Sequence, residues 1–181
     1  MRFTYLMAAI FAAFFLLNFN NARAQYYRQL TVDDFRALPK SNNSVIAYTN
    51  CTIDYSYVAH SEKDYFILDF NIALKMNSNK SWIDKRRVTS AEMLAEILKH
   101  EQGHYNIAYM EQQELLRTVG KTIFYSDYQA RAREIFERID AKYKKLNVSY
   151  DVDTEHMANR DVQRSWDAYF KKQLDDMPPV G

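Results

Sequence analysis

The sequence predicts an α+β domain, in which an N-terminal antiparallel β-sheet packs on one long helix and two further helices. Two observations predict this class: apolar and polar residues alternate in the first half, and apolar residues recur every three or four positions in the second half. A chain of 181 residues suffices for one domain, which we place at residues 25–181. The single cysteine, Cys51, excludes an intramolecular disulfide and a cysteine-rich zinc site.

Residues 1–24 have the order of parts of an export signal. Arg2 precedes an apolar run from Tyr5 to Leu17, and residues 22–24 (Ala-Arg-Ala) offer small side chains at both positions that a signal peptidase reads. The run has about 13 residues, whereas a membrane-spanning helix needs about 20. We therefore expect cleavage after Ala24, no remaining membrane anchor, and a location in the periplasm or outside the cell.

Basic and acidic side chains almost balance, with 24 Lys and Arg against 23 Asp and Glu. A nucleic-acid-binding domain normally carries a clear surplus of positive charge. Nucleic acid is therefore not an expected partner.

Two alternating stretches predict strands at residues 44–58 and 66–76. The first has apolar or aromatic residues on one face at Val45, Ala47, Cys51, Ile53, Tyr55 and Tyr57. The second alternates in the same way from Phe66 to Met76, and the polar residues 60–64 separate the two. We expect an antiparallel hairpin with one buried face.

Three helices are expected in the second half. Residues 89–92 form a capping-box sequence that starts a helix ending near Val119, and residues 126–129 form another that starts a helix ending near Leu146. A polar loop is expected over residues 147–154. The last helix should then carry His156 in its first turn and continue to about Gln173.

The expected long helix contains His100, Glu101 and His104 in the order His-Glu-x-x-His. Residues four apart lie on one face of a helix, so the two imidazoles can bind one zinc ion. Glu101 is rotated about 100° from His100 and can act as a base without ligating the metal. Zinc lowers the pKa of bound water to about 7, which suits hydrolysis of an amide.

A catalytic zinc ion usually takes three protein ligands, so a third must come from elsewhere in the chain. We expect His156 to be this ligand, because the positive end of a helix dipole would keep its ring neutral. Asp151 or Asp153 would then hold the second ring nitrogen of a ligand. The alternatives for the third ligand are acidic residues, namely the acids of the expected loop and five glutamates: Glu111, Glu114, Glu134, Glu137 and Glu155.

The chain resembles a bacterial family described as predicted secreted zinc-dependent proteases. The resemblance lies in the export signal, the β-rich first half, residues 100–108, and the downstream Tyr150, Asp151, Thr154, His156 and Trp166. It implies metal ligation by His100 and His104, Glu101 as the base, and His156 as the third ligand. On the resemblance and on its location, Tyr150 is a candidate oxyanion donor.

The sequence thus favours an exported, zinc-dependent peptidase of zincin-like fold that acts on a peptide or protein substrate. The edge of the expected hairpin at residues 66–76 is a candidate for substrate docking, since zincins pair an extended substrate with an edge strand. Two alternatives stay open. One is a zinc-binding envelope protein without turnover, and the other is an interaction module without metal.

Overall fold

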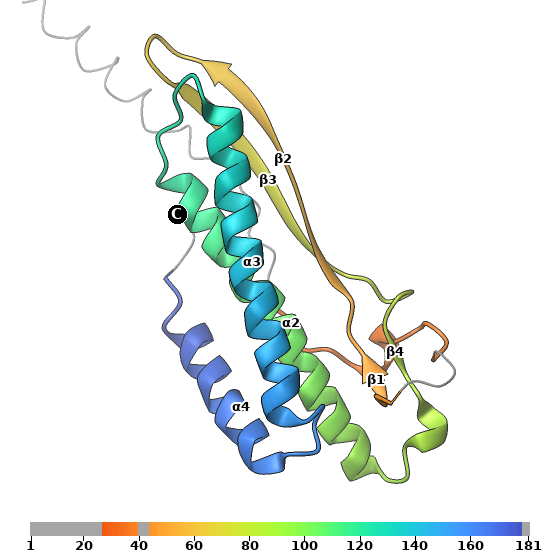
Figure 1. The fold of residues 1–181 in the computed structure, drawn as a ribbon. Helices are drawn as coiled ribbons and strands as arrows, with labels where there is room; N and C mark the ends of the chain where they lie inside the picture. The colour runs from red at the N-terminus through yellow and green to blue at the C-terminus, as the bar shows by residue number, and fades with distance from the viewer. Residues whose placement is uncertain (1–26, 40–43, 179–181) are drawn as a thin grey trace, which may run out of the picture.

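The computed structural model describes residues 27–39 and 44–178. The predicted export signal, residues 1–24, lies outside the described residues. Within them, N-terminal antiparallel strands pack against three helices, which confirms the predicted α+β class. Figure 1 shows the long hairpin lying along the helices. No helix in the described part of the chain is both long and apolar enough to span a membrane.

The predicted hairpin is present as β2 (Cys51–Ser61) and β3 (Phe66–Met76), which pair antiparallel with Cys51 opposite Met76. The predicted strand at residues 44–58 is wrong in one respect, because it is interrupted at Thr49 and Asn50. The backbone N–H of Asn50 donates to the Ser81 hydroxyl, and this bond replaces a continuous ladder. The part before the interruption is β1 (Ala47–Tyr48), which pairs instead with β4 (Trp82–Ile83).

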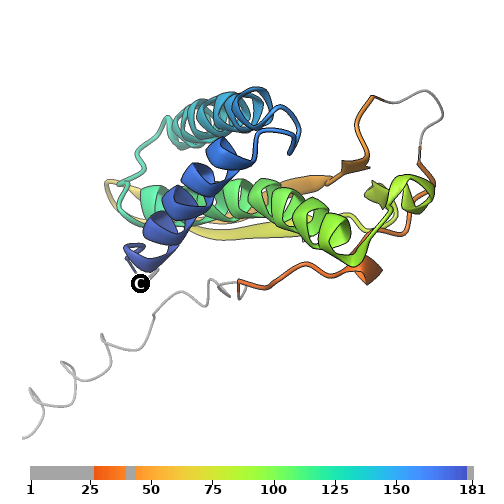
Figure 2. The ribbon, with the colours of Figure 1, turned by 90° about the horizontal axis from the view of Figure 1, so that it is seen from below.

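The long predicted helix is α2 (Ala91–Gly120), whose first turn is capped by Ser90 rather than by Thr89. The second is α3 (Tyr128–Thr154), and its predicted capping box does not form, since Asp127 is the N-cap without a side-chain bond. The third is α4 (Arg160–Asp175), which Figure 2 shows lying against α2. Two short 3-10 helices, η1 (Val32–Asp34) and η2 (Lys85–Arg87), complete the elements.

The predicted loop at residues 147–154 is wrong, because α3 continues through it to Thr154. Tyr150 and Thr154 are fully buried one turn apart, so packing against α2 and α4 outweighs the weak helix preference of the polar residues around them. The predicted start of the last helix is also wrong. His156 lies in the turn after α3, and α4 begins only at Arg160, with Asn159 as its N-cap.

Two groups of buried apolar side chains meet along α2. The first joins the C-terminal half of α2 to β3, α3 and α4, and it includes Ile107, Leu115, Ile139 and Tyr150. The second joins the N-terminal half of α2 to residues 30–35, β1 and β4, and includes Ile97 and Tyr105. The His100–His104 segment lies between these groups, so a packed core fixes the helix on both sides of the motif.

Candidate metal site

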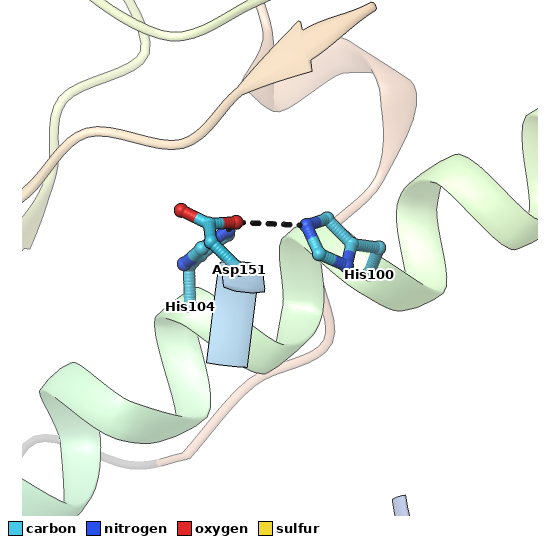
Figure 3. Close-up of side chains that lie close together, drawn as sticks. All are labelled: His100, His104 and Asp151. Atoms are coloured by element: carbon cyan, nitrogen blue, oxygen red, sulfur yellow. Dashed lines mark ion pairs between the residues drawn. The ribbon is translucent and has the colours of Figure 1, made fainter. Parts of the chain in front are cut away.

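Two histidines of α2 and one aspartate of α3 converge (Figure 3). The Nε2 atoms of His100 and His104 lie 3.3 and 3.2 Å from Oδ1 of Asp151. These three ligand atoms all lie within 4.8 Å of one another, and the group can hold a metal ion. Asp151 is brought to the histidines by the antiparallel packing of α3 on α2.

The spacing of the three atoms fits a tetrahedral metal ion. With ligand bonds of about 2.0–2.1 Å, such an ion separates its ligand atoms by about 3.3 Å. The two distances to Oδ1 of Asp151 match this separation, at 3.3 and 3.2 Å. These two separations, together with the donor set of two imidazoles and a carboxylate, fit a small divalent cation that keeps one coordination position for water or a substrate.

Each histidine is held through its other ring nitrogen. Nδ1 of His100 donates to Oε1 of Gln163 at 3.1 Å, and Nδ1 of His104 donates to Oδ1 of Asn147 at 2.8 Å. An imidazole that donates from Nδ1 presents a lone pair at Nε2, which is the arrangement that metal-ligating histidines require. Two lone pairs and a carboxylate oxygen then face one point, and only a cation or a proton makes this arrangement favourable.

Without a metal, a proton takes that place. Burial works against the charged form of His104, but its hydrogen bond with Asp151 and the negative charges of Glu101 and Asp151 raise its pKa to about 9. Burial also opposes ionisation of Asp151, yet hydrogen bonds with His100 and His104 hold its pKa well below the ordinary value. A metal ion must therefore displace a bound proton, and metal binding strengthens as the pH rises.

Gly103 allows α3 to approach α2 this closely. A Cβ atom at Gly103 would clash with the hydroxyl and ring of Tyr150, so no larger residue fits without a shift. That hydroxyl donates to the carbonyl of His100 at 2.9 Å, and the Tyr150 ring stacks on the His100 ring. Because Asp151 follows Tyr150 in α3, the same contact sets the position of the carboxylate.

Glu101 borders a cleft of about 170 Å³ together with the two histidines and Asp151. It is 3% exposed, and its Oε2 accepts a hydrogen bond of 2.6 Å from the Thr49 hydroxyl. The rest of the lining comes from the β1 segment, from α3 and from the turn after α3: Val45, Ile46, Ala47, Tyr48, Thr49, Asn147, His156 and Met157. A fixed carboxylate beside a metal group can accept a proton from water.

His156 does not join the group of three ligand atoms. Its Nδ1 lies 3.3 Å from Oδ1 of Asp151, but its side chain is 55% exposed at the mouth of the cleft. It follows the C-terminal end of α3 and does not lie in the first turn of the next helix, where the sequence placed it. Glu155, His156 and Met157 all have positive φ angles, of 50°, 50° and 78°.

The remaining predicted residues lie elsewhere. Tyr150 is fully buried and does not border the cleft, so it ties His100 to α3 and is not placed to donate to an oxyanion. Asp153 accepts a hydrogen bond from the indole of Trp166 and does not touch a histidine. All five glutamates that were candidates for the third ligand lie outside the metal group: Glu111, Glu114, Glu134, Glu137 and Glu155.

Sequence reasoning assigned Asp151 to the support of a ligand and missed three other residues at the site: Thr49, Asn147 and Gln163. One signal pointed to Asp151. Tyr150 continues the apolar spacing of Ile139, Tyr143 and Leu146, so helix α3 could have been extended through residue 151. The two amides and Thr49 carry no such periodic signal.

The fold and the site together define an α+β protein with a candidate metal site of two histidines and one aspartate. The chain matches the model of a family described as bacterial protein of unknown function, DUF922, over residues 24–158, and it belongs to this family. The matched range contains the complete metal group. No curated protein and no solved structure matches the chain.

Proposed function

We propose that this protein is an exported zinc-dependent peptidase. The observation that carries the proposal is the convergence of the His100, His104 and Asp151 ligand atoms beside the buried carboxylate of Glu101. Two histidines and one carboxylate also suit Fe(II) in oxygenases. Glu101 favours hydrolysis, because a base fixed next to the metal group is what activation of water requires.

The residues of the cleft divide the chemistry among themselves. A bound zinc ion supplies a Lewis acid and lowers the pKa of water to about 7. Glu101 accepts the proton of the attacking water and returns it to the leaving amine, while Thr49 holds its carboxylate in place. Gln163 and Asn147 keep Nε2 of each histidine directed at the metal position.

The substrate-docking edge differs from the one that the sequence suggested. The predicted edge at residues 66–76 does not border the cleft, whereas Val45–Thr49 does. This segment includes β1, and its partner β4 does not border the cleft. An extended peptide laid along Val45–Thr49 brings an amide bond over Glu101.

The proposal is tested with Glu101→Gln, which keeps the shape of the side chain and removes its basicity. The variant should bind one zinc ion per chain like the parent and lose peptide hydrolysis by on the order of 100-fold or more. Glu134→Gln is the matched control, because Glu134 is an exposed helical glutamate paired with Arg131. Its activity and zinc content should equal those of the parent.

Three outcomes would contradict the proposal. Equal hydrolysis by the parent and Glu101→Gln would remove the base from the mechanism. A zinc-loaded parent that cleaves no peptide library would leave a zinc-binding protein without turnover. Iron instead of zinc in protein purified from its native host would point to oxidative chemistry.

A further inference from the structure

A second, larger groove opens from the metal cleft. It has a volume of about 760 Å³ and shares Tyr48, Thr49, His104 and Asn147 with the lining of the cleft. The cleft and the groove therefore adjoin along these four residues. A chain bound over the metal position extends into this groove without leaving the surface.

One wall of the groove is the beginning of β2. Among the described residues, β2 pairs only with β3, so its other edge carries unpaired backbone groups. Successive side chains of a strand point to opposite faces, yet Cys51, Thr52 and Ile53 all border the groove. The edge of the strand thus borders it, and an edge can pair with an extended peptide.

The groove has a closed far end. The ring of Tyr55 on β2 stacks on the ring of Phe136 on α3, with ring centroids 3.6 Å apart. The two walls therefore meet at this stack. Between Thr49 and Tyr55 an extended chain advances about 3.3 Å per residue, so the groove has space for about six residues.

The floor and the α3 wall carry a surplus of negative charge. Glu111 comes from α2, and Glu137, Asp140 and Lys144 come from α3. Asp140 pairs with Lys144 at 2.7 Å, but Glu111 and Glu137 have no ion pair or hydrogen bond with another described residue. Burial and the negative charge of Asp140 raise the pKa of Glu111 to about 7. The positive charge of Lys144 offsets part of this negative charge, and the remaining surplus of carboxylates favours a cationic ligand.

We propose that this groove binds an extended segment of the substrate and that Glu111 selects a lysine or arginine side chain within it. This inference rests on the proposed function and adds a substrate class, namely polypeptides with a basic residue within about six residues of the cleaved bond. The charge of the groove complements a cationic side chain, and its continuity with the metal cleft places that side chain on the same chain as the scissile amide.

A divalent cation is a poorer occupant than a basic side chain. The carboxylates of Glu111, Glu137 and Asp140 do not converge into a metal-ligating group, and within the described residues such a group forms only at His100, His104 and Asp151. An ammonium or guanidinium group on a flexible stem needs no such convergence. It can pair with Glu111 while its backbone follows β2.

The test uses hexapeptide libraries with one position fixed in turn as Lys, Arg, Gln, Glu or Leu. Binding is measured to the zinc-loaded Glu101→Gln protein, which leaves the peptides intact, and cleavage is measured with the parent. We expect a Lys or Arg preference over Gln of about 5- to 10-fold at one position. Adding Glu111→Gln should reduce that preference to less than about twofold, and adding Glu134→Gln should leave it unchanged.

The results separate this inference from the proposed function. Cleavage by the parent with no basic preference, or a preference that survives Glu111→Gln, overturns the role of Glu111 and leaves the peptidase standing. Absence of both cleavage and peptide binding in the zinc-loaded protein overturns both. Zinc content, measured for every variant, shows whether Glu111→Gln acts on the groove alone.

Discussion

Replacing Asp151 by Asn tests whether the third ligand is Asp151, which the structure places in the metal group, or His156, which the sequence suggested. The substitution keeps the size of the side chain and removes the negative charge that faces both histidines. Oδ1 of Asp151 lies 3.3 Å from Nε2 of His100 and 3.2 Å from Nε2 of His104. No other carboxylate of the described residues joins these two nitrogens in a metal-ligating group.

The expected loss of zinc affinity follows from this position. Removing a residue that only supports a ligand typically costs 10- to 100-fold in metal affinity. Loss of a direct ligand should cost more, so Asp151→Asn should bind zinc more than about 100-fold more weakly, or about 2.7 kcal/mol. His156→Ala should lose at most about 10-fold, because the His156 side chain is 55% exposed and outside the group.

The assay is competition for zinc against a chromophoric chelator at fixed pH, with circular dichroism to show that each variant is folded. Asp153→Asn is the matched control, because Asp153 lies two residues further along α3 and contacts Trp166. Its affinity should match that of the parent. A larger loss in His156→Ala than in Asp151→Asn would refute the reasoning and restore the histidine as third ligand.

Three further predictions concern stability. Gly103→Ala should lower the free energy of unfolding by about 1–3 kcal/mol in urea titrations, because its Cβ would meet Tyr150, whereas Gly120→Ala meets nothing within 4 Å and should cost nothing. In the metal-free protein, the pKa of His104 is raised to about 9, so its protonation stabilises the fold fully below pH 6.5; this contribution of at most about 3 kcal/mol should disappear as the pH rises through 9. With zinc in excess, the free energy of unfolding should instead rise over this pH range. If the metal-free and zinc-loaded proteins show the same pH dependence of stability, the assignment is wrong. Glu111→Gln should stabilise the protein by about 1–2 kcal/mol above pH 7 and should have no effect below pH 4.5. The reason is that this half-buried carboxyl has a pKa of about 7, so its ionisation destabilises the native state. Equal effects on stability at both pH values would show that the charge of Glu111 is not the cause.

The half of the site that lies on one helix could be predicted from the sequence, because its geometry is local. The spacing of His100 and His104 fixes their common face as soon as the helix is recognised, and the cap at Ser90 marks where that helix begins. The hairpin was equally accessible, since the alternation at residues 66–76 reproduces the observed strand β3.

The other half depends on how α3 meets α2, which no local rule supplies. The polar residues between Asn147 and Thr154 favour a loop when considered alone, and only the burial of Tyr150 against Gly103 makes them helical. With the loop assumed, His156 lay at the start of a helix and was preferred to the loop acids, and Asp151 was assigned to the support of a ligand. The close contact between Gly103 on α2 and Tyr150 on α3 therefore determines which residue completes the metal group.

The central claim is tested most directly by anomalous diffraction at the zinc edge from crystals of the protein as purified. We predict one peak per chain, about 2.0–2.2 Å from Nε2 of His100, Nε2 of His104 and Oδ1 of Asp151, with Glu101 adjacent and not bound. A peak bound by His156 in place of Asp151 would contradict the assigned ligands, and crystals without any metal peak at these histidines would contradict the zinc site itself.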